Sequence, residues 1–204
     1  MKLLLGTTNI GKIQDYQKYL VHANLKLVTL RDLGILDEPL EIGETYRDNA
    51  LQKARFYAER SEYPTLADDG GLEVDALDGR PGIESSRWLG PNATNDDKIR
   101  KILELLEGVP LARRTARLRN VIIVYFPHER DYVEVEGLRQ GVIPEEKEVL
   151  KRLMPGYPYR SILFLPELDK YYDELTDGER ENHDHRKKAC KELLLKLEPY
   201  ISSQ

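Results

Sequence analysis

Short apolar runs alternate with segments of helical periodicity along this chain, and this alternation restricts its possible folds more than any other feature. Residues 3–5 and 25–28 predict two strands, and residues 12–22 between them carry apolar side chains at helical spacing. A strand–helix–strand unit of this length is typical of a parallel crossover. The sequence therefore predicts an α/β protein.

Further segments continue the same pattern. Helices are expected at residues 45–61, 98–106 and 176–197, and strands at 64–67, 116–126, 132–142 and 161–165. Thr45 is a candidate N-cap for the first of these helices, with Asp48 three residues later. We expect the short strand at 64–67 to deliver Asp68 and Asp69 at its end.

Composition excludes several classes of protein. The 204 residues suffice for a sizeable core, and the single cysteine, Cys190, excludes an intramolecular disulfide or a zinc site with several cysteines. The 31 Lys and Arg against 36 Asp and Glu give a net charge of −5, which excludes an overall basic coat but not a local basic patch. No apolar run approaches the roughly 18 residues that span a bilayer, and the apolar start of the chain is too short for a signal peptide. We therefore expect a soluble intracellular protein. We also expect it to be cytoplasmic and to bind neither nucleic acid nor membranes.

A glycine–lysine loop, Gly6 to Lys12, follows the first strand. Glycine lets the backbone approach a ligand closely, and the start of the next helix offers free N–H groups to a phosphate. The spacing matches G-x-x-x-x-G-K of a P-loop, but Ile13 stands where Ser or Thr would hold Mg²⁺. The loop is therefore either a phosphate site of another kind or an ordinary turn with a surface lysine.

An acidic pair, Asp68 and Asp69, precedes two glycines, and Glu41 is a further acidic candidate. Adjacent carboxylates raise each other's pKa unless a cation intervenes, and Mg²⁺ prefers carboxylate ligands. Taken alone, the string also fits a solvated Asp-Asp-Gly-Gly turn, which is the commoner arrangement. Lys53, inside a predicted helix, either reaches a phosphate or is one solvated lysine among many.

Together these strings resemble the inosine/xanthosine triphosphate pyrophosphatase family, whose members hydrolyse deaminated purine nucleoside triphosphates. The matches occur in family order and span most of the chain. They are Thr7-Thr8-Asn9-Ile10-Gly11-Lys12, Glu41 with Thr45 and residues 49–54, residues 67–77, residues 79–83 with Ser85 and Arg87, and His185-Arg186. The block from Thr45 to Arg87 is the most specific.

The resemblance implies an elongated α/β fold: a long mixed sheet with flanking helices, and two lobes around a central nucleotide cleft. Residues 1–204 would form one domain, with the second lobe at about residues 108–166. The resemblance also implies a homodimer and Mg²⁺-dependent hydrolysis of the triphosphate to monophosphate and pyrophosphate.

Matching positions assign roles by resemblance. Glu41, Asp68 and Asp69 would hold Mg²⁺, and Asp69 would be the base for the attacking water. Lys12 and Lys53 would assist catalysis. The implied substrate-binding residues are Thr7, Thr8, Asn9, Lys12, Lys53, Gly70, Tyr157, Arg180, His185 and Arg186.

The chain departs from the family pattern mainly where the base would be read. Pro155 replaces a stacking phenylalanine and Pro158 an aspartate, whereas Gly156 and Tyr157 match. Tyr157 or Tyr159 is then the candidate for stacking on the base, since stacking needs no particular base edge, and Arg160 could contact an exocyclic oxygen.

Two other matched positions also differ. Gly70 replaces a serine, which removes one phosphate contact, and Arg180 replaces a substrate-binding lysine. The phosphate-binding and metal-binding half of the pattern is otherwise kept, whereas the base-reading half is altered, so hydrolysis is better supported than a preference for hypoxanthine or xanthine.

Three alternatives stay open. The first is a pyrophosphatase with shifted or relaxed base specificity. The second is a nucleotide-binding sensor without turnover, against which the retained acidic and lysine residues argue. The third is a P-loop kinase or GTPase, against which Ile13 argues.

Overall fold

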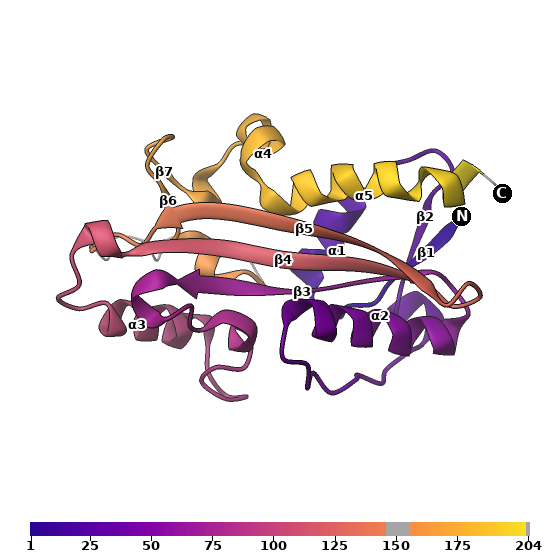
Figure 1. The fold of residues 1–204 in the computed structure, drawn as a ribbon, viewed down its shortest axis with the longest axis horizontal. Coiled ribbons are helices and arrows are strands. Elements are labelled where there is room, and N and C mark those ends of the chain that lie inside the picture. Colours follow the sequence, from indigo (N-terminus) through magenta and orange to yellow (C-terminus); the bar gives the residue numbers. More distant parts are fainter. Residues whose placement is uncertain (146–155, 203–204) are drawn as a thin grey trace. The chain divides into compact units, whose positions relative to one another are not determined.

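The computed structural model describes residues 1–145 and 156–202, and its ribbon is drawn in Figure 1. Within these residues, seven strands form one sheet in the order β2-β1-β3-β4-β5-β6-β7. The strands are β1 (Lys2–Leu5), β2 (Lys26–Thr29), β3 (Thr65–Val74), β4 (Thr115–Phe126), β5 (Asp131–Val142), β6 (Phe164–Leu165) and β7 (Lys170–Tyr171). The α-helices are α1 (Ile10–Tyr19), α2 (Tyr46–Ser61), α3 (Asn95–Leu105), α4 (Asp177–His183) and α5 (His185–Ser202).

The predicted α/β class and mixed sheet are confirmed. Strand β1 pairs in parallel with β2 and with β3, whereas β6 pairs antiparallel with β5 and β7. Helix α1 is the expected crossover between β1 and β2. No helix in the described ranges combines the length and apolar character needed to cross a membrane.

The chain divides into two compact units. Unit 1 contains Met1–Asp69, Asn120–Gly137 and Arg186–Gln204, and unit 2 contains Gly70–Arg119 and Leu138–His185. Strands β3, β4 and β5 contribute residues to both units.

In unit 1, successive side chains of β1 belong alternately to two separate hydrophobic cores. Leu3 and Leu5 pack in a core with Tyr16 of α1, whereas Leu4 packs with Tyr57 of α2. Successive side chains of a strand point to opposite faces, so α1 and α5 cover one face of the sheet here and α2 the other (Figure 1). The three leucines are fully buried, and each contributes about 2 kcal/mol of burial free energy.

Side-chain caps start the two helices that carry the candidate site. The Oδ1 atom of Asn9 accepts a hydrogen bond from the backbone N–H of Lys12 at 3.1 Å, so α1 begins at Ile10 rather than at Lys12. Helix α1 ends at Tyr19, before the predicted end at His22. The predicted cap of α2 is confirmed, because Thr45 Oγ1 accepts from the backbone N–H of Asp48 at 3.1 Å.

The prediction that a strand ends at residue 67 was wrong. Strand β3 continues to Val74, so Asp68 and Asp69 lie inside it and not in a turn. Gly71 permits close packing there, because a Cβ at this position would lie 2.2 Å from Ser85 Oγ. Ser85 Oγ accepts from the backbone N–H of Leu72 at 3.0 Å. The glycine therefore marks a close approach to an extended strand.

The single helix predicted at 176–197 is in fact two helices. Helix α4 ends at His183 and α5 begins at His185, because Asp184 between them is extended (φ −78°, ψ 115°) and fully buried. The strand predicted at 161–165 is only Phe164–Leu165, since Pro158–Ser161 forms a 3₁₀ turn.

Unit 2 has its own core. Ile99 and Ile102 of α3 pack with Leu72 and Val74 of β3. Helix α3 starts at the capping box of Thr94 and Asp97.

Candidate active site

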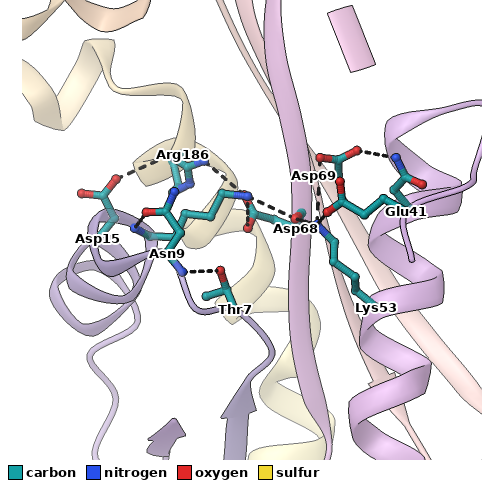
Figure 2. Close-up of polar contacts among 10 residues, drawn as sticks. Thr7, Asn9, Asp15, Glu41, Lys53, Asp68, Asp69 and Arg186 are labelled. Atoms are coloured by element: carbon teal, nitrogen blue, oxygen red, sulfur yellow. Dashed lines mark hydrogen bonds and ion pairs between the residues drawn. The ribbon is translucent and has the colours of Figure 1, made fainter. Parts of the chain in front are cut away.

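The two adjacent aspartates of β3 serve different networks. Strand geometry turns neighbouring side chains to opposite faces, and Figure 2 shows Asp68 and Asp69 pointing away from each other. The carboxylate of Asp68 contacts Lys12 and Arg186, which lie in the first turns of α1 and α5.

The Asp68 carboxylate is a buried anion between two cations. Its Oδ1 lies 2.9 Å from Lys12 Nζ and its Oδ2 lies 3.1 Å from Arg186 Nη2. Burial by itself would raise the pKa of Asp68, but the positive charges of Lys12, Arg186 and Lys53 outweigh it and hold that pKa well below the usual value. Asp68 therefore stays ionised at neutral pH.

Asp15 extends this network and was missed by the sequence analysis. Its Oδ2 lies 3.4 Å from Nη1 of Arg186, so the guanidinium contacts the carboxylates of both Asp15 and Asp68. Asp15 follows Lys12 by three residues on α1, and residues at that spacing share a helix face. That spacing is the signal from which Asp15 could have been found.

The opposite face of β3 carries the second network. Lys53 Nζ donates to Glu41 Oε1 at 2.8 Å and to the backbone carbonyl of Asp68 at 2.8 Å, and it lies 4.0 Å from Asp69 Oδ1 (Figure 2). Nδ2 of Asn49 donates to Asp69 Oδ2 at 2.9 Å. Asn49 was also not proposed as a site residue, although it precedes Lys53 by one helical turn.

Opposite pKa shifts distinguish the two aspartates. Burial raises the pKa of Asp69, and the charges of Lys53 and Lys12 only partly oppose this effect. The pKa of Lys53 is raised as well, because Asp69, Glu41 and Asp68 outweigh the effect of its burial. Neighbouring carboxyl groups whose pKa values are pushed apart are typical of sites that separate a base from a fixed charge.

The loop before α1 holds a small set of hydroxyl and amide groups. Thr7 Oγ1 accepts from the backbone N–H of Asn9 at 3.2 Å, and Asn9 in turn caps the helix that carries Lys12. Burial lowers the pKa of Lys12, against the opposing effect of Asp68. Thr8 lies in the same loop, and its hydroxyl donates to Glu38 at 2.9 Å.

Four predicted substrate-binding residues belong to unit 2: Gly70, Tyr157, Arg180 and His185. Nδ1 of His185 lies 2.8 Å from the hydroxyl of Tyr172. Nη1 of Arg180 lies 3.4 Å from Oδ2 of the buried Asp184. These partners hold both side chains at the junction of α4 and α5.

The region predicted to read the base differs from expectation. Tyr159 is only 5% exposed, and its hydroxyl donates to the backbone carbonyl of Ser85 at 3.0 Å. It therefore packs in the core of unit 2 and offers no open ring face. The guanidinium of Arg160 is also buried and lies 3.7 Å from the ring centroid of Tyr157. Pro155 lies outside the described residues.

The acidic residues fit a divalent cation only in part. Among the described residues, no group of three or more His, Cys, Asp or Glu side chains is arranged to hold a metal. Glu41 and Asp69 do suit one, because both lie beside the positive charge of Lys53 and carboxylate oxygens suit hard cations. The carboxylate of Asp68 is instead directed to Lys12 and Arg186.

Comparison with known proteins supports the resemblance found in the sequence. The Ham1 family matches residues 3–196. The dITP/XTP pyrophosphatase of Thermoanaerobacter pseudethanolicus is 36% identical over 201 residues, covering 98% of this chain and 96% of the relative. The dITP/XTP pyrophosphatase of Escherichia coli is 37% identical over 195 residues, covering 95% and 96%.

Solved structures agree with these relatives. The Ham1 protein of Staphylococcus aureus superposes with a TM-score of 0.83 at 28% identity, covering 98% of this chain and 100% of that chain. A HAM1 protein from Coxiella burnetii superposes with a TM-score of 0.83 at 31% identity, covering 97% and 98%. The chain therefore belongs to the Ham1 family.

Proposed function

We propose that this protein is a nucleoside triphosphate pyrophosphatase that hydrolyses deaminated purine nucleotides such as dITP and XTP. This proposal rests on the two charge networks on opposite faces of β3. On one face Asp69 has a raised pKa and lies beside Lys53. On the other face Lys12 and Arg186 keep Asp68 ionised. Cations on both sides of one strand suit a polyphosphate, and a carboxylate of raised pKa suits proton transfer.

Asp69 is the proposed base in this reaction. Water attacks the α-phosphorus, its proton passes to a carboxylate oxygen of Asp69, and the bond from the α-phosphorus to the oxygen of pyrophosphate breaks. The ammonium groups of Lys12 and Lys53 stabilise the charge that develops on the phosphate oxygens. Asn49 fixes the orientation of Asp69 through the 2.9 Å hydrogen bond to Oδ2.

We propose that Glu41 and Asp69 would hold a divalent cation, and that this cation is Mg²⁺. Such an ion would neutralise charge on the triphosphate when bound. That Asp68 also binds this ion stays a prediction. In this structure the two Asp68 oxygens contact Lys12 and Arg186 instead. The ammonium group of Lys53 lies beside the carboxylates of both Glu41 and Asp69.

The remaining substrate contacts are proposed from the family resemblance. Thr7, Thr8 and Asn9 lie in the loop before α1. The first turn of this helix offers backbone N–H groups to a phosphate. Arg186 lies beside Asp68, and Gly70, Tyr157, Arg180 and His185 complete the proposed set.

We also propose that the protein acts as a homodimer in the cytoplasm and binds no nucleic acid. Light scattering after gel filtration tests the oligomeric state.

A shifted base specificity is a second candidate function, and the burial of Tyr159 favours it. With Tyr159 in the core and Arg160 covering the ring of Tyr157, the region expected to read the base offers few open groups. Such a site would discriminate weakly among bases.

The test is a substrate panel of dITP, ITP, XTP and the four standard nucleoside triphosphates, assayed with Mg²⁺ for pyrophosphate and for orthophosphate. Selective pyrophosphate release from dITP and XTP supports the main proposal, and even release across the panel supports shifted or relaxed specificity. Orthophosphate as the product, or nucleotide binding without any turnover, contradicts a pyrophosphatase. Asp69→Asn protein serves as the matched control for contaminating activity.

A further inference from the structure

Asn120 is a buried polar residue of β4 for which the proposed mechanism has no role. Its side chain is 1% exposed, and within residues 1–145 and 156–202 neither its Oδ1 nor its Nδ2 has a hydrogen-bond partner. An asparagine amide has two donor hydrogens and an acceptor oxygen. Leaving such a group buried without partners is costly. A second state in which the amide gains a partner would explain its presence.

Asn120 and Asp68 lie on the same face of the sheet. Strands β3 and β4 are neighbours, and Leu66 of β3 and Ile122 of β4 belong to one core together with residues of α1 and α5. Alternate residues of a strand share a face. Asp68, two residues from Leu66, and Asn120, two residues from Ile122, therefore face the same helices.

The strand direction puts both residues at the same end of that core. Thr115 donates to Asp75, and Arg117 donates to Glu73, so residue numbers rise along β3 as they fall along β4. The step from the core to Asp68 and the step from the core to Asn120 then run in the same direction. The same contacts place Ile122 opposite Asp68, so Asn120 is the diagonal neighbour of Asp68. Diagonal positions on adjacent strands lie about 7–8 Å apart, which a change of rotamer can bridge.

The carboxylate of Asp68 depends on a cation that the substrate can attract. Lys12 holds Oδ1 of Asp68 at 2.9 Å, and its side chain is 17% exposed whereas that of Asp68 is 0% exposed. A bound triphosphate can therefore reach Lys12. When Lys12 turns to a phosphate, Asp68 remains a buried anion with one donor fewer, which is costly.

We propose that Asn120 is a positioning residue of the triphosphate site, and that its Nδ2 donates to the Asp68 carboxylate when Lys12 turns to the bound phosphates. This inference rests on the proposed function. It gives the amide a partner in the bound state, and it lowers the free energy of moving Lys12. Phosphate binding is thereby coupled to a rotamer change of Asn120.

The test uses Asn120→Leu, which removes the amide and keeps a similar side-chain size. Because the amide has no partner in the free protein, we expect the midpoint of thermal unfolding to stay the same or rise by a few degrees. We expect the affinity for inorganic tripolyphosphate, measured by calorimetry, to fall about tenfold, as for the loss of one hydrogen bond to a charged group. KM for dITP should rise by a similar factor with kcat changed less.

Two further variants make the test specific. Asn120→Ser keeps a donor and should retain tighter tripolyphosphate binding than Asn120→Leu. Ile122→Val, which thins the same core, should lower the unfolding midpoint by a few degrees without changing affinity. If Asn120→Leu lowers the midpoint as Ile122→Val does and leaves tripolyphosphate affinity and KM unchanged, the amide is purely structural and the inference is overturned. Absence of pyrophosphate release by the unsubstituted protein would instead count against the proposed function, since the calorimetry needs no turnover.

Discussion

Asp68 and Asp69 are consecutive residues of β3 whose carboxylates face opposite sides of the sheet and shift in pKa in opposite directions. Lys12 and Arg186 hold the first as a fixed anion, while burial leaves the second as the more basic carboxylate. A strand is the simplest element that can separate two adjacent acids in this way, because its side chains alternate.

Asp69→Asn should lower kcat for dITP by about a thousandfold, the range expected for loss of a general base. The fold should persist, since Asn at this position keeps a hydrogen-bonding side chain beside Asn49. Steady-state kinetics and thermal unfolding measure the two effects. A folded variant with the kcat of the unsubstituted protein would show that Asp69 is not the base.

Asp15→Asn should loosen Arg186, because the guanidinium would lose the charge of the Asp15 carboxylate while its ion pair with Asp68 remains. We expect kcat/KM for dITP to fall about tenfold, as for a lost contact between charged groups. Gln14→Ala is the control, because Gln14 is exposed on the same helix. Equal kcat/KM for both variants would argue against a role for Asp15 in positioning Arg186.

Gly71→Ala should destabilise the protein, whereas Gly178→Ala should not. A Cβ at Gly71 would lie 2.2 Å from Ser85 Oγ and 2.3 Å from the Gly82 carbonyl oxygen, and we expect a loss of about 1–3 kcal/mol in unfolding free energy. Nothing lies within 4 Å of a Cβ at Gly178 in α4, where alanine should add about 0.5–1 kcal/mol. Urea unfolding of both variants measures the difference, and a stable Gly71→Ala protein would contradict the packing described for β3.

Glu179 should make stability depend on pH in the acid range. Hydrogen bonds from the Lys170 side chain and from the backbone N–H of Thr176 lower its pKa from 4.5 to about 2. A lowered pKa in the folded state contributes stability above pH 4.5, and that contribution is lost as the pH falls toward 2.

The comparison with Glu179→Gln isolates this effect. The unsubstituted protein should be the more stable of the two at pH 6, and the difference should shrink toward zero near pH 2. Urea unfolding across this pH range measures it. A difference that stays constant with pH would mean that the pKa of Glu179 is not lowered by folding.

Local patterns in the sequence were sufficient for much of the fold. The alternation of apolar runs with helical segments predicted the α/β class, and the β-branched run at residues 121–124 lies within β4 as expected. Thr45 was identified as a cap because its spacing to Asp48 is a local property of the chain. Motif resemblance likewise pointed to the family before any geometry was known.

Tertiary structure decided the points where local preference and packing disagree. Asp, Asp, Gly and Gly together favour a turn, yet β3 passes straight through them because Gly71 allows close packing against Ser85. Tyr159 resembles an exposed stacking residue in the sequence but is buried by the core of unit 2.

Several residues that contact the predicted site residues were also not identified from the sequence. Asp15 and Asn120 carry no motif of their own, and Asn49 was given no role although it lies in a matched string. Their partners follow from where α1, α2 and β4 lie in unit 1. The sequence alone indicated most of the helices and strands and the candidate residues for the chemistry. Only the tertiary structure decided which charges meet, because a contact between residues far apart in the chain depends on how their elements pack.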